Sequence, residues 1–168
     1  MKNILPMSAL VSLSDKTNLD LLVSFLVEKN VEIISTGGTY KAIKKITDNV
    51  IEVSEYTGHK EMMDGRVKTL HPKIHAGILA RRGEDTDILK SMDYKEIDIV
   101  VVNLYPFEET INSGCSFEEA IEQIDIGGPT MIRAAAKNFK DVLVLSDPSD
   151  YEETVSYTHL RAHETVMN

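Results

Sequence analysis

The chain gathers positive charge in one segment, although its overall charge is negative. Between Arg66 and Arg82 there is no Asp or Glu, whereas the 168-residue chain has a formal net charge of −9 at pH 7. The cations of this segment are Arg66, Lys68, Lys73, Arg81 and Arg82. A local cluster of cations in an acidic chain indicates a binding site for a small anion.

Two polar turns have the composition of phosphate-binding loops. The sequence STGGT (35–39) combines hydroxyls with flexible backbone after an apolar run, and SLSDKT (12–17) offers Lys16 and Thr17 in a similar position. Hydroxyls and free amides at a strand-to-helix turn can bind phosphate. Neither turn matches a Walker loop or the GxGxxG fingerprint. Ordinary turns would explain the same residues, with Ser14 or Asp15 as a helix cap.

Three more residues could do chemistry, and each also has a structural explanation. Tyr105 follows an apolar run and could simply pack with its hydroxyl at the surface. Asp125 could cap the helix that follows it. Lys137 lies late in a predicted helix, where a cation is favourable. Residue type and position alone leave both explanations open for all three.

His71 and His75 are four residues apart, which is the spacing of two metal ligands on one helical face. Pro72 argues against a helix interior at this point, and no third ligand is evident nearby. We therefore predict no metal site at these histidines.

The elements that must position these residues alternate along the chain. Helices are predicted at 16–30, 40–46, 116–124 and 127–139, from apolar residues at helical spacing and from cap residues. Strands are predicted at 8–14, 31–35, 50–53, 97–104 and 141–146, and residues 54–73 are predicted to be irregular. Strands separated by helices pair in parallel, so we predict an α/β three-layer sandwich with a mainly parallel sheet.

This predicted sheet brings the candidate loops to one edge. In parallel α/β folds, ligands bind at the carboxyl ends of the strands. The first four strands are followed by SDKT, STGGT, the basic segment and NLYPF. We therefore expect these loops to form a single site.

Composition limits the class of protein. Hydrophobic residues make up 42% of the chain and charged residues 27%, which suits one globular domain. No apolar run reaches the ~18 residues of a membrane span, and the N-terminus is a poor signal peptide, so we expect a cytoplasmic protein with no membrane partner. The single Cys115 excludes an intramolecular disulfide. The net charge of −9 argues against a nucleic-acid partner.

The end of the chain breaks the pattern. From Ser156 onward, SYTHLRAHETVMN has no clear period and no core-forming run. The phrase resembles translated sequencing-adapter DNA, and an ordinary polar C-terminal segment is the alternative. We interpret residues 156–168 as a non-native tail and exclude His159 and His163 from any site.

Five segments, taken in order, resemble one family: SDKT, STGGT, DGRVKTLHPKIHAGIL, NLYPF and IDIGGPTMIRAAAKN. They resemble the inosine monophosphate cyclohydrolase domain, the N-terminal part of a bifunctional purine biosynthesis protein. The resemblance runs from about Ser8 to Tyr151, and its third and fifth segments are long and specific. It implies a methylglyoxal-synthase-like fold, which agrees with the α/β sandwich predicted above.

The resemblance also implies a ring closure, the last step of de novo purine biosynthesis. The carboxamide nitrogen of 5-formamidoimidazole-4-carboxamide ribonucleotide attacks its formyl carbon, and loss of water gives inosine monophosphate. Enzymes of this class are cyclic amidine hydrolases acting in the ring-closing direction. Because both reacting groups belong to one molecule, no cofactor or metal is implied. The protein must fold the substrate, stabilise an oxyanion and transfer protons.

The matching positions imply a catalytic cluster of Lys68, Tyr105, Asp125 and Lys137. Asp125 would accept or orient the amide proton. Tyr105 and Lys137 would polarise the formyl oxygen and help it leave as water, and Lys68 would hold charge near that oxygen. The residues implied to bind phosphate and ribose are Ser12, Ser14, Lys16, Ser35, Thr36, Gly37, Thr39, Arg66, Thr69, Asn103, Gly127 and Gly128.

The rest of the basic segment receives other interpretations. His71 and Pro72 are expected to shape the loop. Lys73, Arg81 and Arg82 are interpreted as surface charge.

Alternatives within the same fold remain open. In carbamoyl phosphate synthetases this fold serves as an allosteric domain that binds nucleotides without catalysis. Methylglyoxal synthase is a third possibility. The catalytic cluster favours the enzyme, because a binding module would not need it.

The resemblance implies a purine ribonucleotide as partner and, in full-length members, a homodimer. We expect residues 1–155 to be a cyclohydrolase domain shortened at its C-terminus, without the transformylase domain.

Overall fold

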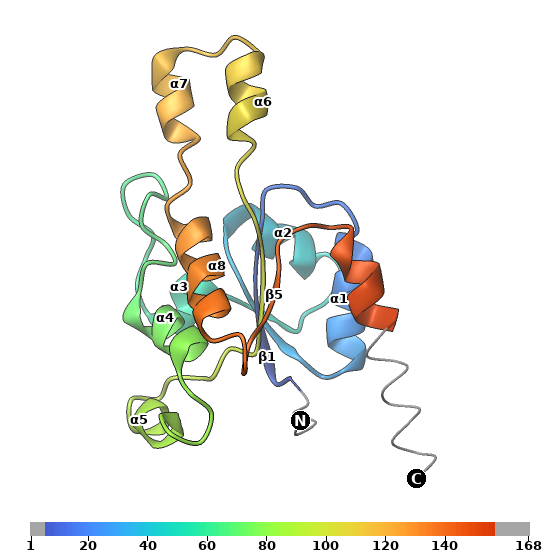
Figure 1. Cartoon of the computed structure of the whole chain (residues 1–168), viewed down its shortest axis with the longest axis vertical. Coiled ribbons are helices and arrows are strands. Elements are labelled where there is room, and N and C mark those ends of the chain that lie inside the picture. Colours follow the sequence, from blue (N-terminus) through green and yellow to red (C-terminus); the bar gives the residue numbers. More distant parts are fainter. Residues whose placement is uncertain (1–5, 157–168) are drawn as a thin grey trace.

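The computed structural model describes residues 6–156 and has one five-stranded sheet (Figure 1). All strand pairs are parallel, and the strand order is β3-β2-β1-β4-β5. The predicted three-layer α/β sandwich is thus confirmed. The strands are β1 (Ser8–Leu13), β2 (Glu32–Ser35), β3 (Val50–Glu52), β4 (Ile99–Asn103) and β5 (Leu143–Leu145).

Alternate residues of each central strand enter opposite hydrophobic layers, as the two-residue period of a strand requires. Ala9 and Val11 of β1 pack in one layer, whereas Leu10 packs in the other. Likewise, Ile33 and Ile34 of β2 belong to different layers. Because both faces of the sheet are covered, these strands are continuous apolar runs, and this is why the sequence reveals them.

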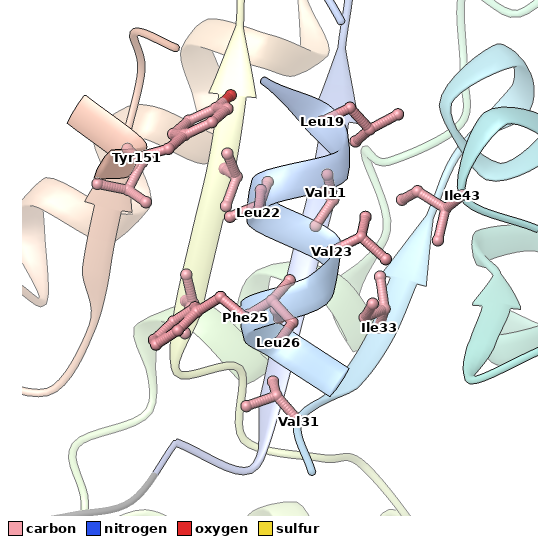
Figure 2. Close-up of a cluster of buried hydrophobic side chains, with 14 of the residues drawn as sticks. Val11, Leu19, Leu22, Val23, Phe25, Leu26, Val31, Ile33, Ile43 and Tyr151 are labelled. Carbon is pink, nitrogen blue, oxygen red and sulfur yellow. The ribbon is translucent and has the colours of Figure 1, made fainter. Parts of the chain in front are cut away.

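The first layer is built on α1 (Leu19–Glu28), which lies across one face of the sheet (Figure 2). Its buried side chains, including Leu22 and Leu26, meet Ile33 of β2 and Tyr151. Tyr151 belongs to a helix formed by residues 150–156. Residue 156, which we assigned to the tail, therefore continues that helix, and residues 157–168 lie outside the described residues.

The second layer contains α3 (Val53–Thr57), α4 (Pro72–Leu79) and α8 (Gly127–Lys137). The remaining helices are α2 (Gly37–Lys44), α5 (Thr86–Ser91), α6 (Phe107–Asn112) and α7 (Phe117–Glu122). The prediction that residues 54–73 are irregular is wrong at both ends, because α3 and the start of α4 lie there. The argument against a helix interior at Pro72 agrees with the structure, although a helix does begin there. This proline is the first residue of α4, where its missing N–H costs nothing.

The helices α6 and α7 form an arm that stands away from the body of the molecule (Figure 1). Neither helix has a buried residue. A capping box begins α7, since Ser116 and Glu119 exchange side-chain to backbone hydrogen bonds. The arm begins and ends next to β4 and α8, so it connects the two elements that frame the site described below.

Arg82 is not surface charge, contrary to the sequence interpretation. Its guanidinium is only 10% exposed and donates to the carbonyls of Ala80 and Ile97 and to Asp98 Oδ1, at 2.7, 2.8 and 3.1 Å. Asp98 Oδ2 in turn accepts from the amides of Met7 and Ser8. These residues join the amino ends of β1 and β4, so Arg82 holds the sheet together at the edge opposite the candidate site.

Lys73 and Arg81 have different partners from Arg82. The Nζ of Lys73 lies 4.7 Å from the centroid of the Tyr56 ring. Arg81 is exposed and pairs with Glu84 and Asp85, both on its own segment.

Within residues 6–156, no helix is both long and apolar enough to span a membrane.

Candidate functional site

A cavity of about 620 Å³ opens at the carboxyl ends of β1, β2 and β4. The strand order reverses direction between β1 and β4, since β2 and β3 follow on one side of β1 and β5 follows on the other side of β4. Such a reversal leaves a crevice that parallel α/β proteins use for ligands. The loops after these strands, the basic segment and the first turn of α8 surround the cavity, as we expected from the sequence.

Asn103 shapes the loop after β1. Its Oδ1 accepts from the amides of Ser14 and Asp15 at 2.6 and 2.9 Å, and its Nδ2 donates to the Asp15 carbonyl at 2.7 Å. Because three hydrogen bonds join its side-chain amide to the backbone of Ser14 and Asp15, Asn103 positions the loop that carries Ser14 and Lys16. Lys16 reaches the cavity wall, and its Nζ lies 3.3 Å from the Leu13 carbonyl.

The hydroxyls of Ser12, Thr36 and Thr39, near the carboxyl ends of β1 and β2, divide into two groups. Ser12 Oγ and Thr36 Oγ1 lie 3.0 Å apart at the cavity, and one of these hydroxyls donates to the other, so the second hydroxyl can still donate to a ligand. Thr39 instead accepts from the Leu13 amide and donates to the Leu13 carbonyl, both at 2.9 Å. Thr39 therefore fastens α2 to the end of β1.

Ser35 and Gly37 do not line this cavity, contrary to expectation. Ser35 is fully buried and its hydroxyl donates to the Val11 carbonyl at 2.7 Å, which ties β2 to β1. Gly37 has a φ of +41°, a conformation that suits glycine. It lines a neighbouring cavity of about 290 Å³ together with Glu61 and Lys68.

Lys68 lies between the two cavities and lines both. Its Nζ is 3.6 Å from Glu61 Oε2, and its side chain is 30% exposed. A Cβ on Gly65 would lie 2.7 Å from Lys68 Cε, so the glycine makes room for the lysine. Gly65 also has a φ of +85°, and any other residue would be strained there. The backbone thus holds a partly exposed ammonium at the cavity, with a single weak ion-pair partner among the described residues.

Arg66 crosses from the basic segment to the arm and pairs with Glu122 at the end of α7. The hydrogen bond from Arg66 to Glu122 raises the pKa of the arginine. Both side chains are more than half exposed and both line the cavity. An anionic ligand would compete with Glu122 for this guanidinium.

Thr69 lies against the start of α8. Its side chain is 5% exposed, and a Cβ on Gly127 would meet Thr69 Oγ1 at 2.6 Å. Gly127 is therefore needed for this close approach, and both residues line the cavity.

Asp125 caps α8, as its structural explanation predicted. Its Oδ1 accepts from the Gly128 amide at 2.8 Å. No hydrogen bond to Oδ2 is found within residues 6–156, and this oxygen belongs to a half-buried side chain on the cavity wall. A Cβ on Gly128 would lie 2.5 Å from Asp125 Oδ2, so glycine is required beside the carboxylate. One oxygen of Asp125 is thus structural, and the other is free for chemistry.

Tyr105 lines the cavity and is 45% exposed, whereas Lys137 does not line it. Lys137 is the last residue of α8, and the cavity meets only the first residues of that helix and Met131. Of the four side chains expected to converge, Lys68, Tyr105 and Asp125 share this cavity, and Lys137 lies outside its lining at the far end of α8.

His71 and His75 do not form a metal pair. His71 Nδ1 accepts from the Lys73 amide at 3.1 Å and so caps α4. No cluster of three or more His, Cys, Asp or Glu side chains placed to hold a metal was found in residues 6–156.

Several wall residues carried no signal in the sequence. Glu122 looked like one of many charges on a solvated helix, and nothing in its spacing indicated contact with Arg66. The apolar wall formed by Leu70, Ile121, Ile124 and Met131 was also missed. These side chains meet only because the arm returns to the body at α8, which a one-dimensional pattern does not show.

Comparisons with known proteins agree with this architecture. A family model described as the MGS-like domain matches residues 19–130. The chain is 58% identical over 149 residues to the bifunctional purine biosynthesis protein PurH of Clostridium acetobutylicum, an alignment that covers 88% of this chain. The chain spans 30% of the length of that relative. Its fold is similar to the crystal structure of ForH, with a TM-score of 0.75, 35% identity, and coverage of 90% of this chain and 78% of the other.

Proposed function

On the premise that the chain belongs to the MGS-like domain family and is related to PurH, we propose that it closes the second ring of a purine ribonucleotide. The substrate would be 5-formamidoimidazole-4-carboxamide ribonucleotide and the product inosine monophosphate. The observation that carries this proposal is the convergence of Lys68, Tyr105 and Asp125 on a single cavity at the reversal of strand order.

One side of the cavity suits the 5′-phosphate. The Ser12 and Thr36 hydroxyls and the Lys16 ammonium line it, and Asn103 holds the backbone that carries Lys16. Hydroxyls and an ammonium group are common phosphate ligands. We propose that the phosphate binds here and that Arg66 exchanges Glu122 for the substrate.

The other side suits the ring closure. Asp125 Oδ2 would accept the proton of the carboxamide nitrogen as that nitrogen forms its bond to the formyl carbon. The formyl oxygen gains negative charge in this step, and the Lys68 ammonium would stabilise it. Tyr105 would donate a proton to that oxygen. A second proton, returned from Asp125, then lets the oxygen leave as water, while the former formamido nitrogen loses its proton to Tyr105 and forms the double bond to the former formyl carbon.

Lys137 is left out of this scheme because it lies outside the cavity. Tyr105 alone takes the role that the sequence divided between the two residues.

Absorbance in the ultraviolet tests the proposal, because closing the second ring changes the purine chromophore. We expect the chain alone, with no added cofactor, to convert the formylated ribonucleotide to inosine monophosphate. The Tyr105→Phe variant should bind substrate but turn over more slowly. Tight binding of the nucleotide without any product would instead support a regulatory nucleotide-binding domain of the same fold.

We also propose a second copy of the chain as a partner. Three large apolar side chains of the arm are exposed to solvent: Phe107 and Ile111 at 44% each, and Phe117 at 76%. The two helices of the arm have six residues each and are too short to be stable without packing against another surface. Sedimentation equilibrium should show a dimer that Phe117→Ser weakens. A wild-type chain that stays monomeric at 100-fold different concentrations would contradict this.

A further inference from the structure

A short hairpin places Glu61 opposite Lys68. Met62 and Val67 form an antiparallel bridge, in which each amide donates to the carbonyl of the other residue, at 3.1 and 3.3 Å. The next residues outward in an antiparallel pair also face each other, and here they are Glu61 and Lys68. Lys68 Nζ lies 3.6 Å from Glu61 Oε2. The register of the hairpin therefore brings the two charges together.

The turn of this hairpin supports the same pairing. Met63, Asp64 and Gly65 have φ values of +53°, +55° and +85°. Successive residues with positive φ are typical of the tight turns whose twist matches that of a hairpin. A Cβ on Gly65 would lie 2.7 Å from Lys68 Cε and 3.7 Å from Glu61 Oε1. The charged pair therefore packs over the bare backbone of Gly65.

The Lys68 ammonium also lies beside the first turn of α2. A Cβ on Gly37, the first residue of that helix, would lie 3.6 Å from Lys68 Nζ. The N-terminus of a helix carries partial positive charge, which is unfavourable to a nearby cation. Glu61 is the carboxylate that pairs with this ammonium among the described residues, and its charge offsets the repulsion. Without Glu61, we expect the ammonium to leave this place.

The ion pair leaves the ammonium able to bind a ligand. A separation of 3.6 Å is longer than a hydrogen bond, so Glu61 attracts Lys68 without occupying its three N–H donors. Both residues line the smaller cavity, whereas only Lys68 also lines the larger one. Glu61 therefore acts on the ammonium from the side away from the ligand.

We propose that Glu61 is a positioning residue that holds the Lys68 ammonium at the wall of the larger cavity, where negative charge develops during ring closure. The catalytic half of this proposal rests on the proposed function, whereas the hold on Lys68 does not. The formyl oxygen carries more negative charge in the transition state than in the substrate. A displaced ammonium therefore slows turnover more than it weakens binding.

Substitutions of Glu61 test the catalytic half. Glu61→Gln removes the charge and keeps the size of the side chain. We expect kcat for cyclisation to fall about threefold, as for a partly exposed ion pair, while KM changes by less than about 1.5-fold. Glu61→Asp keeps the charge on a shorter side chain and should recover part of the loss. Glu52→Gln is the matched control, because Glu52 lines the same smaller cavity but forms no ion pair within residues 6–156.

The Lys68→Met background tests whether Glu61 acts through Lys68. Adding Glu61→Gln to Lys68→Met should leave kcat unchanged. An equal loss of kcat in both backgrounds would overturn the proposal, because Glu61 would then act without the lysine. A loss of the same size in Glu52→Gln would also overturn it. So would a rise in KM at constant kcat in Glu61→Gln.

NMR relaxation of the Lys68 side chain tests the hold without any ligand. We expect the order parameter of the Lys68 Cε–H bonds to fall in Glu61→Gln and to keep its wild-type value in Glu52→Gln. Equal order parameters in wild type and Glu61→Gln would overturn the hold. If the wild-type chain forms no inosine monophosphate, the proposed function fails and takes the catalytic half with it. The order parameters would still decide whether Glu61 holds Lys68.

Discussion

The two ends of the basic segment use similar side chains for opposite purposes. At the C-terminal end, Arg82 is buried and its guanidinium donates to two carbonyls and to the Asp98 carboxylate. At the N-terminal end, Lys68 is partly exposed at a cavity and has one carboxylate, Glu61, at 3.6 Å. Charge alone does not separate these two cations. The number of fixed acceptors around each one does.

The difference follows from the position of each residue along the sheet. Arg82 lies at the amino ends of the strands, where carbonyls and carboxylates from several elements surround it. Lys68 lies at the carboxyl ends, where a parallel sheet leaves a crevice. A cation held by several fixed acceptors stabilises the fold, whereas a cation that faces open space can bind a ligand.

Arg82→Met should have the largest effect on stability. It leaves the Asp98 carboxylate buried without its cation, and removing one partner of a buried pair typically costs about 3–5 kcal/mol. Urea denaturation would measure the free energy of unfolding. The neighbouring Arg81→Met is the control, because Arg81 is exposed and pairs only within its own segment, so it should be close to wild type. Equal losses from both substitutions would remove the distinction between buried and exposed cations.

Lys68→Met should have the largest effect on ligand binding. The loss of one charge-assisted contact corresponds to about 10- to 100-fold in affinity for inosine monophosphate. The unfolding free energy should change little, because Lys68 has a single long ion pair. Lys73→Met, in the same segment but outside the cavity, is the matched control for calorimetry. A stability loss in Lys68→Met as large as that of Arg82→Met would contradict the comparison.

Asp125 combines both behaviours in one side chain, so two substitutions should separate them. Asp125→Asn keeps an N-cap acceptor for the Gly128 amide but lacks a base, and turnover should fall by about 100-fold or more with stability nearly unchanged. Asp125→Ala should lose the same turnover and about 1 kcal/mol of stability in addition. Turnover and thermal denaturation of both variants provide the measurement. If Asp125→Asn is fully active, the carboxylate is only a cap.

The smallest effect is expected at the exposed ion pair between Arg66 and Glu122. Glu122→Gln frees the guanidinium, and affinity for inosine monophosphate should rise by about twofold, as expected for an exposed pair. Glu118→Gln, on the same helix but outside the cavity lining, serves as the control. A decrease in affinity on Glu122→Gln would mean that the carboxylate holds the ligand instead of competing with it.

The strands of the sheet could be predicted because each one is marked by an apolar run within its own short stretch of sequence. Runs such as IDIVVV become strands buried on both faces, and five predicted strands correspond to β1 to β5. The short helices α3, α5 and α6 escaped prediction, because a single turn or two leaves no clear apolar period. The helix α4 was missed because Pro72 was read as a breaker instead of a first residue.

The site was predicted in part, and the errors concern side chains whose partners lie on other segments of the chain. The family resemblance grouped Lys68, Tyr105 and Asp125, and all three line one cavity, because each follows or precedes an element that ends at the same edge of the sheet. Ser35 was misjudged because a hydroxyl at the end of a strand can turn inward, as it does toward the Val11 carbonyl. Arg82 was misjudged because its partners come from segments distant in sequence.

Hydrogen exchange with and without inosine monophosphate tests the central claim most directly. The claim is that the cavity edge of the basic segment binds the nucleotide, while the Arg82 edge only supports the fold. We predict that the ligand slows exchange in residues 35–39, 64–70 and 125–128 and leaves residues 80–98 unchanged. Slowed exchange confined to residues 80–98, or no change in residues 64–70 at saturating ligand, would contradict the account.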